Sequence, residues 1–128
     1  MKCGAYSLKL CPPGDLILTT LSGFFTVAGA AAYAVEAEQL IKRTALQNGG
    51  YRLIIDVSGC SIQPQDVIAA FSAHVTAVPR ARRLAVVTGS SIIRMQMRRI
   101  IGRSDIAMFE SATDALIWCN TIPLDVAV

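Results

Sequence analysis

The sequence is poor in charged residues and contains a single histidine. Charged side chains make up 16% of its 128 residues and hydrophobic ones 53%, and no linker or low-complexity segment stands out. This composition excludes a disordered protein and is typical of a packed globule. The length suits one domain, so we expect residues 1–128 to form a single unit.

The sequence also lacks paired cysteines. Cys3, Cys11, Cys60 and Cys119 include no C-x-x-C pair, and His74 is the only histidine that could join them. A structural zinc site needs four such ligands at characteristic spacings, so we expect no metal site, and no motif calls for a cofactor. The thiols are instead typical of reduced, small apolar residues in a cytoplasmic protein.

A membrane-spanning segment is not expected either. The uncharged stretch of residues 16–35 is long enough to span a bilayer, but threonine, serine and glycine interrupt it, and its two halves differ in periodicity. We interpret it as a strand followed by a helix. The N-terminus carries one lysine and no long apolar core, so we predict no signal peptide and a cytoplasmic location.

Acidic residues are missing from one long region. None lies between Asp66 and Asp105, whereas seven arginines do, at positions 80, 82, 83, 94, 98, 99 and 103. The net charge of +3 is too small to indicate nucleic-acid binding, which would call for a higher pI and a basic face with aromatic residues. The local imbalance instead predicts one basic face.

Hydrophobic periodicity and turn residues predict alternating strands and helices. Strands are expected at 5–10, 16–21, 51–57, 83–88 and 106–109, and helices at 26–47, 64–78, 91–103 and 111–120. The residues Pro12-Pro13-Gly14-Asp15 form a strong turn signal, so the first two strands should form a hairpin. Strands that alternate with helices imply an α/β fold with a mostly parallel sheet.

This order of elements, with the phrases LIIDVSG at 53–59 and FESATDALIW at 109–118, resembles the STAS superfamily of sulfate transporters and anti-sigma factor antagonists. It is closer still to small bacterial SpoIIAA-like proteins. The resemblance covers nearly the whole chain. It implies a mixed sheet flanked by helices and a non-enzymatic function, namely binding of protein partners and sometimes of nucleotides or lipids.

The resemblance also implies a switch that this chain lacks. Anti-sigma factor antagonists are switched by phosphorylation of a serine in an Asp-Ser pair, where the helix after the inner strand begins. That place holds Gln63-Pro64 here, and proline has no hydroxyl. Ser58 and Ser61 lie nearby as candidates, but neither follows an acid.

Asp56 stands near the end of the predicted inner strand, where phospho-receiver domains keep their acceptor. Such a site needs Mg²⁺ held by an acidic pair after an early strand, and a lysine further along the chain. The last lysine is Lys42, and Asp15 precedes a strand instead of following one. We therefore predict that Asp56 accepts hydrogen bonds from backbone amides of residues 58–61.

The segment from Gly89 to Arg103 offers two candidate sites. Ser90 and Ser91 open a helix and, with Arg94, could bind an anion; the alternative is that Ser90 only caps the helix. Along that helix one half is apolar, formed by Ile92, Ile93, Met97, Ile100 and Ile101. The other half is basic, formed by Arg94, Met95, Arg98, Arg99 and Arg103. The basic half suits an acidic protein partner or anionic lipid headgroups, with a merely solvated face as the alternative.

The sequence thus predicts a STAS-like, non-catalytic, cytosolic binding or regulatory module that acts through a protein partner. Neither His74 nor any serine or cysteine stands in a catalytic motif. The small residues of the first helix add a homodimer as a further option. The alternative function is a carrier that holds a lipid or nucleotide between sheet and helix. It predicts an apolar cavity, for which Phe24, Phe25 and Tyr33 are candidate lining residues, or an anion at Ser90 and Ser91.

Overall fold

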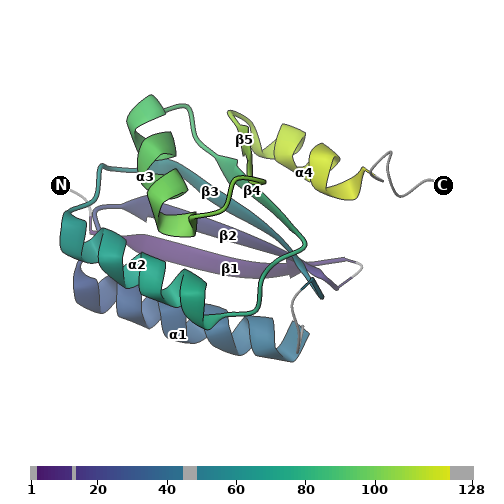
Figure 1. Ribbon diagram of the computed structural model, residues 1–128, viewed down its shortest axis with the longest axis horizontal. Helices are drawn as coiled ribbons and strands as arrows, with labels where there is room; N and C mark the ends of the chain where they lie inside the picture. Colours follow the sequence, from purple (N-terminus) through teal and green to yellow (C-terminus); the bar gives the residue numbers. More distant parts are fainter. Residues whose placement is uncertain (1–2, 13, 45–48, 122–128) are drawn as a thin grey trace.

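Within residues 3–12, 14–44 and 49–121, which the computed structural model describes, the chain forms a five-stranded sheet with helices on both faces (Figure 1). The elements follow one another as β1 (Ala5–Cys11), β2 (Leu16–Gly23), α1 (Val27–Thr44), β3 (Arg52–Cys60), α2 (Gln65–Ala77), β4 (Arg83–Val87), α3 (Ser91–Ile101), β5 (Ala107–Phe109) and α4 (Ala112–Asn120).

The strands lie side by side in sequence order. Strand β1 is antiparallel to β2, and the other neighbours are parallel. Gly14 closes the β1–β2 turn at a φ of 115°, which glycine adopts without strain, and its N–H donates to the Cys11 carbonyl at 2.9 Å. The predicted α/β fold with an N-terminal hairpin and a mostly parallel sheet is confirmed.

Strand β3 extends to Cys60, beyond the predicted end at residue 57. Gly59 and Cys60 pair with Ser22 and Gly23 of β2, which itself extends past its predicted end at residue 21. The pairing is close: a Cβ on Gly59 would lie 3.0 Å from the Cβ of Ser22. The prediction of a loop immediately after residue 57 is therefore wrong, because backbone pairing with β2 outweighs the turn preference of these small residues.

The uncharged stretch at 16–35 divides into β2 and the first half of α1, as predicted. Helix α1 is described as far as Thr44, and its predicted last turn at 45–47 lies outside the described residues. No helix in the described part of the chain is long and apolar enough to cross a membrane.

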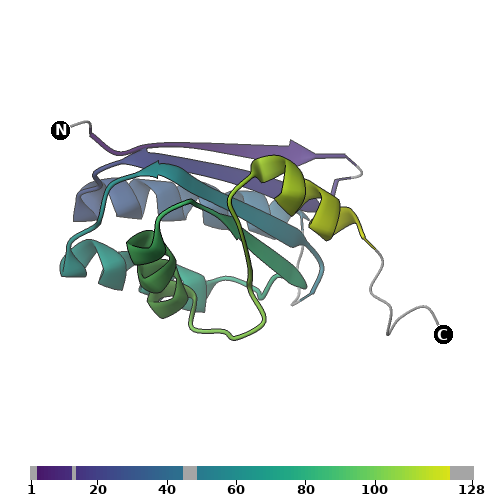
Figure 2. The same cartoon turned by 90° about the horizontal axis from the view of Figure 1, so that it is seen from above.

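Helices α1, α2 and α3 cover one face of the sheet, and α4 covers the other (Figure 2). We call these the α1–α3 face and the α4 face. Strand β3 contributes to both: Ile55 and Val57 join the larger core under α1–α3, whereas Ile54 joins the smaller core under α4. Covered faces explain why this inner strand is apolar on both sides.

A buried arginine at the start of β3 fixes α4 in place. Nη1 of Arg52 donates to the Cys119 carbonyl at 2.7 Å and to Oδ1 of Asn120 at 2.8 Å. Nη2 donates to Oδ1 of Asp15 at 2.8 Å, and Arg82 binds the other oxygen of that carboxylate. These bonds, that of Arg52 above all, hold the pKa of Asp15 below its usual value. The Arg52 guanidinium therefore links the β1–β2 hairpin, β3 and the C-terminus of α4.

Candidate functional site

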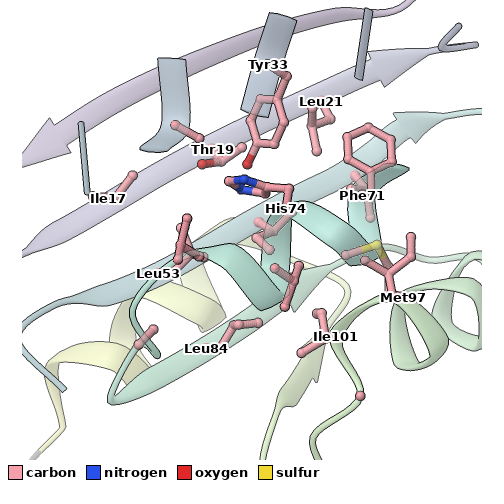
Figure 3. Close-up of a pocket in the computed structure, with 18 of the residues that line it drawn as sticks. Ile17, Thr19, Leu21, Tyr33, Leu53, Phe71, His74, Leu84, Met97 and Ile101 are labelled. Atoms are coloured by element: carbon pink, nitrogen blue, oxygen red, sulfur yellow. The ribbon is translucent and has the colours of Figure 1, made fainter. Parts of the chain in front are cut away.

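The core under α1–α3 is not completely filled. A cavity of about 330 Å³ lies between the sheet and the three helices (Figure 3). Its size is near the lower end of small-molecule pockets. Its lining is mainly apolar and includes Ile17, Leu21, Leu53, Phe71, Met97 and Ile101.

Three polar side chains from three elements meet at one wall of this cavity. Thr19 comes from β2, Tyr33 from α1 and His74 from α2, and Figure 3 shows their polar ends turned toward a common space. The rings of Tyr33 and His74 meet edge to face, with centroids 5.4 Å apart. Thr19 is fully buried, and its Oγ1 has no hydrogen-bond partner among the described residues. Thr19 lies near enough to Tyr33 to act on the pKa of its hydroxyl, but Thr19 Oγ1 forms no hydrogen bond with it.

The polar wall carries no charge at neutral pH. Burial raises the pKa of Tyr33 to about 12, and the nearby Thr19 hydroxyl offsets only part of that rise. Burial also lowers the pKa of His74, although Glu38 lies 3.5 Å from its Nδ1 and acts in the opposite direction. The His74 imidazole is therefore neutral at pH 7. His74 is 9% exposed, so its side chain packs within the core.

The sequence named some residues of this cavity and missed others. Tyr33 and Phe25 line it as anticipated, whereas Phe24 is not among its lining residues. Thr19 was missed. The signal was present, because Thr19 stands between Ile17 and Leu21 at an inward-facing position of the alternating strand β2, where an apolar residue is expected.

Arg103 borders one end of the cavity, and its expected place on the exposed basic face is wrong. Gly102 takes the left-handed conformation at a φ of 69° and turns the chain, so α3 ends at Ile101, two residues before its predicted end. Arg103 then donates from Nε and Nη2 to Asp105 at 2.7 and 2.8 Å, and from Nη1 to the Ala81 carbonyl at 2.8 Å. These bonds lower the pKa of Asp105 to about 2 and use all three guanidinium nitrogens.

The other candidates on α3 form an exposed patch. Met95 is 56% exposed, and Arg98 and Arg99 are exposed with no ion pair in the described part of the chain. Ile92, expected in the buried half, is 50% exposed, so that assignment is wrong. It stands in the first turn of α3, where Ile93 instead faces the core.

A pair of glutamines joins this patch to the loop between β3 and α2. Gln63 donates its backbone N–H to Oε1 of Gln96 at 3.1 Å, and Nε2 of Gln96 donates to the Gln63 carbonyl at 3.0 Å. Ile62, the neighbour of Gln63, is 53% exposed. We call the surface formed by Ile62, Ile92, Met95, Arg98 and Arg99 the α3 surface.

At the start of α3, Ser90 acts as the helix cap. Its Oγ accepts a hydrogen bond from the Ile93 N–H at 3.2 Å, and its own N–H donates to Oγ1 of Thr88. Ser91 is exposed, and Arg94 lies 3.6 Å from a Glu110 oxygen. Capping accounts for Ser90, and the anion site stays a prediction.

Asp56 makes the expected local bond from within β3. Its Oδ1 accepts from the Ser58 N–H at 3.0 Å, and the side chain is half-buried. Ser58 is exposed at the end of the strand, and the Ser61 N–H donates to the Gly23 carbonyl at 3.1 Å. No group of three or more His, Cys, Asp or Glu side chains in the described residues is placed to hold a metal ion.

Solved structures with the same arrangement include an uncharacterized protein of the DUF3478 family from Shewanella loihica, described as having a SpoIIAA-like fold. It is 13% identical, with a TM-score of 0.68 over 90% of this chain and 92% of that one. This chain has the SpoIIAA-like fold. An anti-sigma factor antagonist from Mycobacterium paratuberculosis is also 13% identical, with a TM-score of 0.64 over 91% of this chain and 96% of the other. No protein-family model and no curated protein sequence matches the chain.

In this SpoIIAA-like chain, α2 begins at Gln65 and Pro64 stands at its N-cap. The cap makes no side-chain hydrogen bond, and neither Gln63, Pro64 nor Gln65 carries a hydroxyl. The nearest preceding hydroxyl is that of exposed Ser61. The helix start that the resemblance associated with a phosphorylated serine thus offers no phosphate acceptor.

Proposed function

We propose that this protein is a non-catalytic, cytoplasmic regulatory module that binds a protein partner through the α3 surface. The proposal depends on one observation: exposed Ile92 and Met95 share α3 with Arg98 and Arg99, which form no ion pair in the described part of the chain. Exposed Ile62 adjoins Gln63, which is hydrogen-bonded to Gln96 of the same helix. Exposed apolar groups bordered by charge are typical of protein-binding sites. The similar anti-sigma factor antagonist supports a role of this class.

The chemistry of the surface indicates the partner. Because no acid lies between Asp66 and Asp105, the charge of Arg98 and Arg99 is not compensated along the sequence. A partner with an acidic rim around an apolar centre would complement them. The Gln63–Gln96 bonds hold the loop and the helix together before binding, which reduces the ordering cost of association.

Binding would not be controlled by phosphorylation at the start of α2. Pro64 removes the acceptor there, so the module is expected to bind its partner constitutively or under a signal other than phosphorylation of the β3–α2 segment. Phosphoproteomic mass spectrometry of the purified protein tests this. Stoichiometric phosphate on Ser58 or Ser61 would contradict it.

Affinity capture from a lysate of the source cells, with tagged protein, tests the surface. Changing Arg98→Glu and Arg99→Glu together should remove the captured protein while leaving the Tm unchanged. The matched control is Lys42→Glu with Arg43→Glu, an equal charge change on exposed residues of α1. Equal capture by both variants would refute the α3 surface.

A second candidate function is a small-ligand carrier, because the cavity under α1–α3 is the apolar space that a carrier requires. A lipid-like molecule fits it better than a nucleotide. Phosphates need cationic partners, and the nitrogens of Arg103 are already used by Asp105 and Ala81. Native mass spectrometry compared with the denatured mass tests this candidate; a small molecule retained only in the native spectrum is expected.

A further inference from the structure

The unpartnered hydroxyl of Thr19 is the feature of the cavity that points to a specific ligand chemistry. Thr19 has 0% exposure, and its Oγ1 forms no hydrogen bond within the described chain. Buried polar atoms of native proteins nearly always have a partner. A molecule in the cavity that presents a hydrogen-bonding oxygen to this wall would supply it, with the Tyr33 hydroxyl as a second contact (Figure 3).

Two charged side chains of the described residues line the cavity, Arg80 and Arg103, and both are paired with Asp105. The polar wall consists of the hydroxyls of Thr19 and Tyr33 and the neutral imidazole of His74. Glu38 contacts His74 from α1. An ionised headgroup moved from water into such a space would lose its hydration without gaining a counter-charge. An uncharged ligand avoids this cost.

The polar wall has apolar lining residues on both of its sides, and Ser61, Gln63 and Gln96 line the cavity farther along. In β2 the lining residues on either side of Thr19 are Ile17 and Leu21; in α2, Phe71 and Val75 line the cavity before and after His74. A ligand oxygen that reaches Thr19 must therefore have apolar groups on both of its sides. A terminal headgroup would place its oxygen away from Thr19 or leave the apolar lining on one side uncovered.

We infer that the cavity binds an uncharged, mainly apolar molecule with a carbonyl or hydroxyl oxygen in its middle, and that Thr19 donates the hydrogen bond that selects it. The inference rests on the second proposed function, the small-ligand carrier. It adds the ligand class and the residue that recognises it.

Three probes of similar length separate the possibilities: undecan-6-one, with a central carbonyl; undecane, with no oxygen; and decanoate, with a terminal charge. Binding is measured by native mass spectrometry and by the shift in Tm. Wild type should bind the ketone about fivefold more tightly than undecane, the typical net effect of one hydrogen bond, and decanoate least. The variant Thr19→Val should lose this preference and bind undecane at least as tightly as the ketone, because the ketone oxygen would no longer receive the Thr19 hydrogen bond.

Matched variants make the result specific to this wall. Thr20→Val changes the neighbouring, exposed threonine on the opposite face of β2 and should retain the preference for the ketone. Ala37→Leu adds volume inside the cavity and should weaken binding of all three probes. If Thr19→Val does not fold, Tyr33→Phe removes the second hydroxyl and should reduce the preference for the ketone.

The outcomes distinguish this inference from the carrier function itself. Equal affinity of wild type for ketone and undecane, or an unchanged preference in Thr19→Val, would overturn the role of Thr19 while the carrier stands. Tightest binding of decanoate would overturn the uncharged class, again leaving the carrier. Failure of all three probes to bind would overturn both.

Discussion

The two faces of the sheet hold their helices by different means. On the α4 face, Ala85 and Ala115 are fully buried in a small core, and Arg52 fixes the end of the helix through bonds of 2.7 and 2.8 Å. On the α1–α3 face, three helices border a cavity of about 330 Å³ and an unpartnered threonine hydroxyl. One face therefore has closely packed, directional contacts, and the other has room to accept a molecule.

We interpret the α4 face as the part that mainly stabilises the fold and the α1–α3 face as the part that binds. Charged hydrogen bonds require exact positions, so a helix held by them has little freedom to shift. Apolar contacts are non-directional, so helices packed around a cavity can adjust to an occupant. Both binding surfaces proposed above, the cavity and the α3 surface, belong to the α1–α3 face. Three sets of substitutions test this difference between the two faces.

The largest effect is expected on the α4 face, from Arg52→Met. It leaves the Cys119 carbonyl and the Asp15 carboxylate without their main donor, and breaking a buried ion pair typically costs about 3–5 kcal/mol. The free energy of unfolding, measured in urea, should fall by about that amount. The control Arg82→Met removes the exposed partner of the same carboxylate and should cost at most about 1 kcal/mol. Equal losses of unfolding free energy in the two variants would show that Arg52 stabilises the protein no more than Arg82 does.

An intermediate effect should come from one substitution made on both faces. Ala115→Leu adds volume where Ala115 is fully buried in α4 and should lower the free energy of unfolding by about 2 kcal/mol. Ala37→Leu adds the same volume beside the cavity and should raise it by about 1 kcal/mol. Thermal and urea unfolding measure both. Destabilisation by both variants would mean that the cavity has no usable space.

The smallest effect concerns His74 and pH. Burial lowers the pKa of His74 in the folded protein, so the unfolded chain binds a proton more readily as the pH falls below 7. Stability should therefore decrease from pH 7 to about 5.5, a range above the titration of most carboxyl groups. His74→Leu should flatten this dependence, since His74 is the only histidine. A variant that keeps the wild-type slope would assign it to another group.

The sequence predicted the fold better than the sites because periodicity and turn residues are local signals. The Pro12–Asp15 turn, the apolar strands and the Ser90 cap all stand in short stretches, and the structure confirms each in its described residues. What could not be predicted depends on distant partners. Arg52 stands at a strand start but is buried by contacts 37 and 67 residues away.

The same reason explains the errors at the candidate site. Gly102 redirects Arg103 toward Asp105, which a helical projection of 91–103 cannot show. The exposure of Ile92 depends on which side chains the sheet and the other helices place against α3. The cavity is set by how three helices pack across the sheet, so the sequence offered Phe25 and Tyr33 as lining residues and a polar Thr19 at an inward position but could not predict its size.

We expect the protein to bind its partner on the α1–α3 face. Backbone amide hydrogen exchange, compared between the free protein and its complex with the captured partner, tests this most directly. In the complex, exchange should be slower than in the free protein for residues 61–63 and α3, and unchanged for β1 and α4. Protection confined to α4 or β1 would contradict it.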